Sequence, residues 1–160
     1  MKRALAAIGA SLMVTATAAL AQKPPSNNKP MPVPAQPAEV AGVWLNPTGN
    51  TRVRISPCGP ALCGSITWLK ISNDPQTGEP LTDKNNPDPA SRNRPLLGLQ
   101  LLTDLKPGRA AGEWTGKVYS PNEGKFYNAN FSMDGPNEIK MEACLVIGLL
   151  CRTQTWTRVN

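Results

Sequence analysis

The chain has 160 residues, a formal charge of +6 at neutral pH, 17 prolines, 4 cysteines and no histidine. This length suits one folded core, and the lack of histidine excludes the usual Ser-His-Asp and Cys-His catalytic sets. The basic residues are scattered instead of gathered in a patch, so we expect no nucleic-acid partner.

The N-terminal stretch MKRALAAIGASLMVTATAALAQ has the three parts of a secretory signal. Lys2 and Arg3 supply the charged start, residues 5–14 the apolar core, and Ala19–Ala21 an A-x-A cleavage site. The apolar core is too short to span a bilayer, which takes about 20 residues. We therefore expect a signal peptide at residues 1–21, a mature chain without a transmembrane anchor, and a periplasmic or secreted location.

A proline-rich segment follows the signal. Pro24 to Pro37 contains six prolines and few residues able to form a core. Such composition favours extended, semi-rigid spacers. We expect a linker at residues 22–39 and a single folded domain at residues 40–160.

The domain contains short stretches rich in β-forming residues, several with alternating polar and apolar side chains, separated by turn signals. The predicted strands cover residues 42–45, 51–55, 65–69, 97–103, 113–119, 125–133, 138–145 and 153–159. No long helical pattern occurs outside the signal. Eight short strands indicate an all-β fold, a small antiparallel barrel or sandwich, with one long loop between the third and fourth strands.

The first and last strands favour the barrel. Closing a barrel places these two strands side by side, so Trp44 and Arg158 could form a cation–π pair. Such an arrangement is similar to the G-x-W and C-terminal Arg of lipocalin-like barrels. The alternative is that Trp44 simply fills the core.

Four cysteines in an exported chain favour two disulfides over a zinc site or free thiols. Cys58 and Cys63 bracket one tight turn, and Cys144 and Cys151 bracket another. Four cysteines allow three connectivities, and the turns favour the two local pairs because they bring each pair close. The spacings match no common zinc pattern, and we expect no metal ion and no cofactor.

The stretch TDKNNPDPASRNRPLLG, residues 82–98, is too long and polar for an ordinary connection. Its candidate ligand-binding or lid residues are Asp83, Asn86, Asp88, Arg92 and Arg94, and Trp44 and Arg158 of the first and last strands are candidates as well. The arginines could pin the loop to its own aspartates, or recognise a carboxylate or phosphate on a ligand. The loop as a whole could cover one mouth of the barrel as a lid, or protect an exposed strand edge.

The apolar segment at residues 145–150, between two cysteines, has two interpretations. Exposed, it would mark a partner or membrane contact. Bent inward, it would plug one end of the barrel, and we expect the plug.

Three segments together carry a family resemblance: the CG-x-x-L-CG segment at Cys58–Gly64, the long loop at Thr82–Gly98, and QTWTRV at Gln154–Val159. With them the domain resembles the bacterial exported family labelled "domain of unknown function 2147". The resemblance implies an envelope or secreted location and a lipocalin-like β-barrel. It implies no biochemical activity.

For function we expect a non-catalytic barrel that binds a small apolar or amphipathic ligand. The motivation is the barrel pattern, the loop, and four tryptophans expected inside, Trp44, Trp68, Trp114 and Trp156. The rival is a filled barrel that acts as an interaction module for an envelope protein partner. A cavity of about 300 Å³ or more would separate them. Carboxylate catalysis is not excluded, with the candidates Asp83, Asp88, Asp104, Glu113, Glu123, Glu138 and Glu142.

Overall fold

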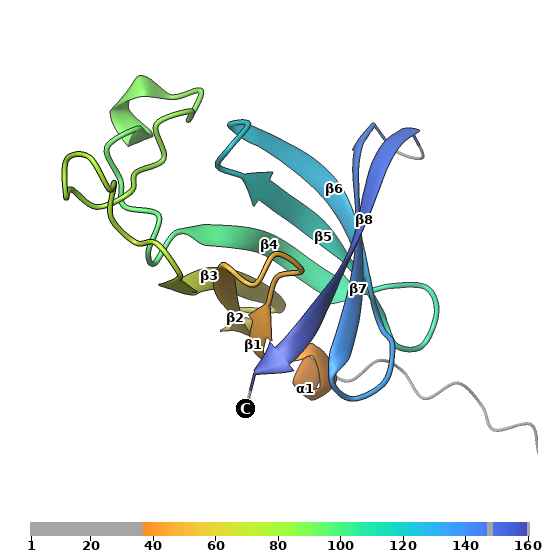
Figure 1. Ribbon diagram of the computed structural model, residues 1–160. Coiled ribbons are helices and arrows are strands. Elements are labelled where there is room, and N and C mark those ends of the chain that lie inside the picture. The colour runs from red at the N-terminus through yellow and green to blue at the C-terminus, as the bar shows by residue number, and fades with distance from the viewer. Residues whose placement is uncertain (1–36, 147–148, 160) are drawn as a thin grey trace, which may run out of the picture.

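The computed structural model describes residues 37–146 and 149–159, which form a closed barrel of eight antiparallel strands in chain order (Figure 1). The elements are α1 (Pro37–Val40), β1 (Gly42–Leu45), β2 (Thr51–Cys58), β3 (Ala61–Leu69), η1 (Pro89–Ser91), β4 (Gln100–Pro107), β5 (Glu113–Ser120), β6 (Lys125–Met133), β7 (Glu138–Val146) and β8 (Leu149–Val159). The predicted signal peptide and most of the predicted linker lie outside the described residues. Within those ranges, no helix has the length and apolar character needed to cross a membrane.

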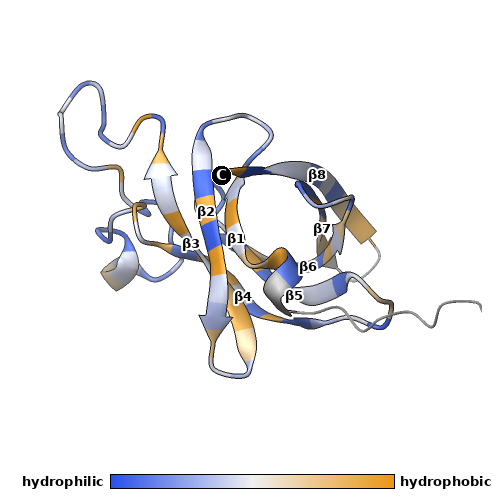
Figure 2. Ribbon diagram, turned by 90° about the horizontal axis from the view of Figure 1, so that it is seen from below, coloured by the Kyte–Doolittle hydropathy of each residue, from blue (hydrophilic) through white to orange (hydrophobic). Residues whose placement is uncertain are grey.

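Alternation of side chains explains why these segments are strands. On β2, Val53 and Ile55 are buried while Arg54 between them is exposed. Figure 2 shows the same alternation as orange and blue bands along β2. Because successive side chains of a strand point to opposite faces, each such strand places one face in the core and one in water.

The barrel closes through its first and last strands. Trp44 of β1 pairs with Arg158 of β8, and β8 also pairs with β7. The predicted choice of a barrel is therefore confirmed. With every strand paired on both sides, the sheet has no free edge.

The short helix α1 lies at one end of the barrel (Figure 1). Trp44 is fully buried there, and its Nε1 donates to the carbonyl of Val40 in α1 at 2.9 Å. The Arg158 guanidinium lies 4.2 Å from the Trp44 ring centroid and donates to the carbonyls of Glu39 and Ala41. The predicted cation–π pair forms, and Trp44 fills the core as well.

Trp68 is a correction to the expected interior. Its side chain is 36 % exposed and stacks on Arg52, whose guanidinium carbon is 4.7 Å from the ring centroid. Val53 pairs with Ile66 but Arg52 pairs with Trp68, so Thr67 is an extra residue in β3. Such a bulge shifts the alternation by one residue, and Trp68 therefore points outward.

The long loop separates β3 from β4, as predicted, although β4 begins at Gln100 instead of Leu97. Gly98 has a φ of +87° and donates its backbone N–H to the carbonyl of Ile66 at 2.9 Å. This left-handed residue turns the chain before the ladder of β4 begins.

Both disulfides join the local pairs, Cys58 with Cys63 and Cys144 with Cys151, as the turns favoured. Each closes the tight end of a hairpin, between β2 and β3 or between β7 and β8. Disulfides of this kind are typical of proteins that mature outside the cytoplasm.

Candidate functional site: the open end of the barrel

The end of the barrel opposite α1 holds a cavity of about 170 Å³. Its mouth lies between the β5–β6 turn and the β7–β8 hairpin, at the top in Figure 1. The lining residues come from β4 to β8 and are Leu101, Val118, Tyr119, Ser120, Pro121, Glu123, Tyr127, Met141, Ala143, Arg152, Gln154 and Trp156.

Strand alternation places five of these side chains inside the barrel. Arg152, Gln154 and Trp156 are every second residue of β8, and Met141 and Ala143 are the matching positions of β7. Trp156 and Met141 are buried, whereas Arg152 and Gln154 are exposed. The lining thus changes from apolar on the inside to polar at the rim.

The polar rim is a small network around Glu123. The Tyr127 hydroxyl donates to Glu123 Oε2, and Arg152 Nη1 lies 3.3 Å from Oε1. The hydrogen bond to Glu123 raises the pKa of Tyr127, and its partial burial acts in the same direction. The Arg152 side chain is 77 % exposed, and exposed ion pairs contribute little, so a polar ligand group could replace Glu123 as its partner at low cost.

The size of the cavity restricts what it can hold. Its volume is below the 300 Å³ expected for a site that encloses a drug-sized ligand. A cavity of about 150 Å³ still admits a benzene-sized molecule. The barrel is therefore partly filled, with room for one small apolar group.

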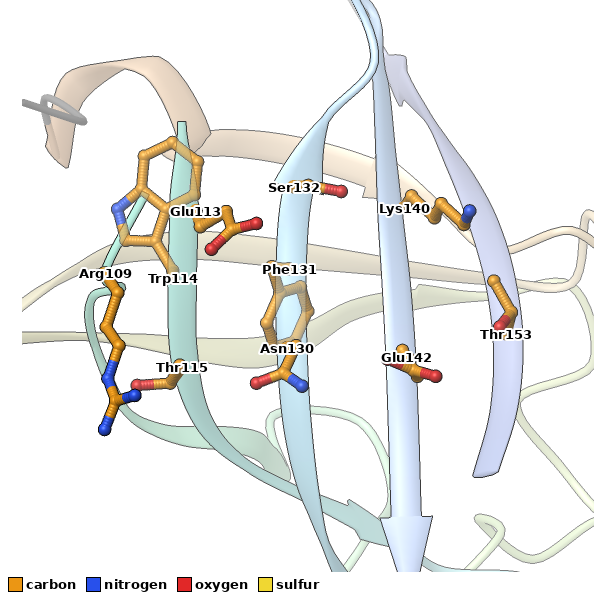
Figure 3. Close-up of a pocket in the computed structure, with 10 residues that line it drawn as sticks. All are labelled: Arg109, Glu113, Trp114, Thr115, Asn130, Phe131, Ser132, Lys140, Glu142 and Thr153. Carbon is orange, nitrogen blue, oxygen red and sulfur yellow. The ribbon is translucent and has the colours of Figure 1, made fainter. Parts of the chain in front are cut away.

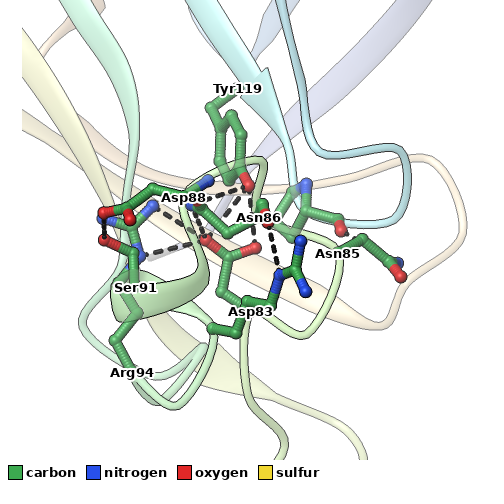
Figure 4. A network of polar contacts seen from close by, with 9 residues as sticks. Asp83, Asn85, Asn86, Asp88, Ser91, Arg94 and Tyr119 are labelled. Carbon is green, nitrogen blue, oxygen red and sulfur yellow. Dashed lines mark hydrogen bonds and ion pairs between the residues drawn. The ribbon is translucent and has the colours of Figure 1, made fainter.

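The long loop is organised around the carboxylate of Asp83, which is fully buried (Figure 4). The Tyr119 hydroxyl donates to both carboxylate oxygens, at 2.8 and 3.0 Å. Arg94 donates to Oδ2 through Nε at 3.0 Å and Nη2 at 2.8 Å, and Asn86 Nδ2 donates to the same oxygen at 2.7 Å. Burial raises the pKa of Tyr119, and the hydrogen bond and negative charge of Asp83 add to it.

The other predicted loop residues also have partners within the loop. Asp88 caps the short helix η1 by accepting from the Ala90 N–H and the Ser91 hydroxyl, and these two bonds lower its pKa. Arg92 Nε donates to the carbonyl of Asn86 at 2.8 Å. Arg94 thus pairs with a loop aspartate, as the internal alternative expected, whereas Arg92 contacts a backbone carbonyl of the loop and no aspartate.

The loop packs on the outside of the barrel, against β5 and the β5–β6 turn. Asn85 Nδ2 donates to the carbonyls of Pro121 and Asn122, at 3.3 and 2.9 Å. No residue of the 82–98 stretch lines the described cavity, and Tyr119, which the loop contacts, is only 2 % exposed. The loop was expected to cover the mouth of the barrel or to protect an exposed strand edge. It instead covers the outer face of β5.

Trp44 and Arg158 lie at the closed end and do not line the cavity. The seven predicted ligand-binding or lid residues thus form two separate clusters, and neither faces the hollow interior. Among the residues that line the cavity, sequence reasoning named Trp156 as an interior residue and Glu123 as a carboxylate. Arg152 and Tyr127 were missed, although their alternation along β8 and β6 could have indicated them.

A second hollow, of about 620 Å³, lies on the outer face of β5 to β8 (Figure 3). Glu113 of β5 and Glu142 of β7 project from this face on either side of β6, together with hydroxyl and amide side chains such as Asn130 and Thr153. Its lining is mainly polar but also includes Trp114 and Phe131 of the core, so this open groove borders the packed interior.

The apolar hairpin tip is another correction. Leu145, Leu149 and Leu150 are 42 %, 64 % and 74 % exposed, so these residues do not plug the barrel. They belong to the ends of β7 and β8, which pair with each other and extend beyond the barrel rim (Figure 1). Residues 147 and 148 lie outside the described part.

Comparisons with known proteins agree with this architecture. Residues 42–158 match the model of a family described as "Uncharacterized protein conserved in bacteria (DUF2147)". The chain belongs to this family. The family therefore covers nearly all of the barrel, from the start of β1 to the Arg158 that stacks on Trp44, and the resemblance noted in the sequence is confirmed.

The barrel is also similar to the solved structure of protein HP1028 from Helicobacter pylori, which is described as belonging to the lipocalin family. The TM-score is 0.62 at 21 % identity, over 75 % of this chain and 82 % of the other. At this identity the likeness shows the lipocalin-like fold alone. A search of the curated proteins found no match.

Proposed function

We propose that the protein is an exported, non-catalytic β-barrel that binds a small amphipathic molecule at its open end. The cavity beneath the Glu123–Arg152 rim carries this proposal, because its lining is apolar inside and charged at the mouth. An apolar group would enter the cavity, and a polar group would meet Arg152 or Glu123.

The small volume supports a ligand that is only partly enclosed. The closed half of the barrel is occupied by Trp44, Trp114 and Phe131, which are almost wholly buried. Some small barrels are packed solid by side chains and others hold a small ligand. This barrel has one packed end and one end with a cavity. A ligand of ordinary size would leave its polar part outside the rim.

The experiment is native mass spectrometry of the mature protein purified from a bacterial periplasm, followed by organic extraction. We expect a co-purifying small molecule, or binding of one member of a panel of short-chain carboxylates, amines and alcohols in a calorimetric titration. The mature mass should lack residues 1–21, which tests export in the same measurement.

Ala143→Phe is the variant that tests the site, since Ala143 lines the cavity and a phenyl ring there would occupy it. Ala111→Phe is the matched control, because Ala111 is exposed in the β4–β5 turn. Loss of binding in the first variant alone supports the proposal. Equal binding by both variants, or no binding by the parent protein, overturns it.

The rival function, an interaction module, is favoured by one observation, the exposed leucines of the β7–β8 hairpin. Ligand binding does not require them to be exposed. Their chemistry supports a separate inference.

A further inference from the structure

The tip of the β7–β8 hairpin, defined here as Leu145, Leu149 and Leu150, is an apolar projection in a mostly polar surface. These three are among the seven large hydrophobic side chains that the described part of the chain exposes. Leu150, at 74 %, is the most exposed of the seven. Exposed apolar clusters of this kind mark contacts with partners or membranes.

A disulfide joins the two strands at the base of the tip. Cys144 and Cys151 lie directly opposite each other in the β7–β8 ladder and are joined by a disulfide. Val146 and Leu149 continue the pairing beyond the disulfide. This pairing satisfies part of the backbone's polar groups and so lowers the penalty for moving the paired residues out of water.

The distribution of the leucines favours lipid over a protein groove. The exposed leucines lie on both strands of the hairpin, Leu145 on β7 and Leu149 and Leu150 on β8, so they are not confined to one strand. A protein groove usually contacts one face, whereas a lipid surface surrounds the inserted tip. No charged residue occurs in the sequence between Cys144 and Cys151.

The charges around the tip favour an anionic surface. Arg152 follows the disulfide, and Lys125 begins β6 at the same end of the barrel; both are exposed. The loop beside the β5–β6 turn adds exposed Lys84 and Arg92. Glu123 and Asp88 offset part of this charge, as does exposed Glu142, whose carboxylate lies within 4.8 Å of the disulfide sulfurs. Without residues 1–21 the chain has 15 basic and 11 acidic residues, a formal charge of +4.

We propose that the β7–β8 tip inserts into the surface of an anionic phospholipid bilayer, with the basic rim residues against the headgroups. This docking does not depend on ligand binding. It would place the mouth of the cavity at the lipid surface, because the tip and the mouth share one end of the barrel (Figure 1).

The test is co-sedimentation of the full mature protein with vesicles of phosphatidylglycerol and phosphatidylethanolamine, compared with vesicles of phosphatidylcholine alone. We expect binding to the anionic vesicles that weakens as salt is raised, since salt screens exposed charges. The variant Leu149→Ser with Leu150→Ser should bind roughly tenfold more weakly or worse, from the lost apolar area.

The matched control is Ile71→Ser with Leu97→Ser, which removes two exposed apolar side chains from the long loop between β3 and β4. It should bind as the parent does. A Leu149→Trp reporter should shift its fluorescence to the blue on the anionic vesicles, because its indole enters an apolar environment.

Three outcomes would overturn the inference. The parent protein could ignore both kinds of vesicle, or the tip variant could bind as tightly as the control variant. The tip variant could instead convert a dimer in solution to a monomer without any vesicle binding by the parent. That last result would assign the tip to a second copy of the chain.

Discussion

Tyr119 and Asp83, which are 36 positions apart in the chain, are joined by a 2.8 Å hydrogen bond that fastens the long loop to the barrel. The phenol comes from β5, a regular strand, and the carboxylate from the irregular stretch between β3 and β4. Arg94 closes the arrangement by pairing with the same carboxylate and lying over the Tyr119 ring, 5.7 Å from its centroid. The loop is thereby built around one buried charge.

Asp83→Asn should destabilise the protein by about 2–4 kcal/mol, measured by urea denaturation. The substitution removes the negative charge that the Tyr119 hydroxyl and the Arg94 guanidinium both contact. Arg94 is 43 % exposed in its side chain, so water recovers part of the loss. Asp88→Asn is the control, because Asp88 is exposed and asparagine caps a helix about as well as aspartate does. If both substitutions lowered the free energy of unfolding equally, the role given to Asp83 would be wrong.

In the Tyr119→Phe variant, the free energy of unfolding should fall less steeply as the pH rises into the alkaline range. Burial and Asp83 raise the pKa of Tyr119 above the value of about 10 in an unfolded chain. As the pH rises, the phenol loses its proton in the unfolded state before it does so in the folded state. The stabilisation is therefore complete below about pH 10 and is lost as the pH rises from there through the higher pKa of the folded state. Unfolding free energies across pH 8 to 12 test this, with Tyr127→Phe for comparison because its pKa is also raised.

Gly124→Ala should loosen the contact between the loop and the β5–β6 turn. Gly124 has a φ of +63°, and a Cβ there would run into the backbone carbonyl of Asn85. We expect a cost of about 1–3 kcal/mol from the conformation and the collision. Gly135→Ala is the control, since Gly135 also has a positive φ but has nothing near its Cβ position; a similar cost in both would assign the effect to conformation alone.

Replacing either cysteine pair by serine should lower stability by about 2 kcal/mol, because each disulfide closes only a short loop. Denaturation of the Cys58→Ser with Cys63→Ser variant and of the Cys144→Ser with Cys151→Ser variant checks the size. The intact protein should also be lighter than its reduced form by two hydrogen atoms for each bond. A reduced chain as stable as the oxidised one would contradict the prediction.

Much of the fold was predictable from local patterns. Lys125–Met133 and Gly42–Leu45 were predicted at their observed bounds, because alternation and flanking turn residues define them without reference to the rest of the chain. β8 was predicted to begin at residue 153 but begins at Leu149. Its first three residues, Leu149 to Cys151, are all apolar, so they carry no period-2 signal.

The site was less predictable because it depends on register. Asp83 and Arg94 were among the loop residues expected to pair with one another, but their partner Tyr119 could be found only once β5 lay beside the loop. The exposure of Trp68 depends on one extra residue in β3, which no alternation pattern announces. The cavity itself is the space left after the large side chains fill the other end, and that requires the packed structure.

The pairing of β1 with β8 also constrains the order in which the protein can fold. Trp44 can meet Arg158 only once residue 158 has left the ribosome, so the barrel cannot close before all eight strands have been made. Until then β1 has an open edge on one side, and open edges invite pairing with other chains. The last strand therefore acts as the completing step of folding, and loss of a few residues from it would harm yield far more than loss of a few residues from a surface loop.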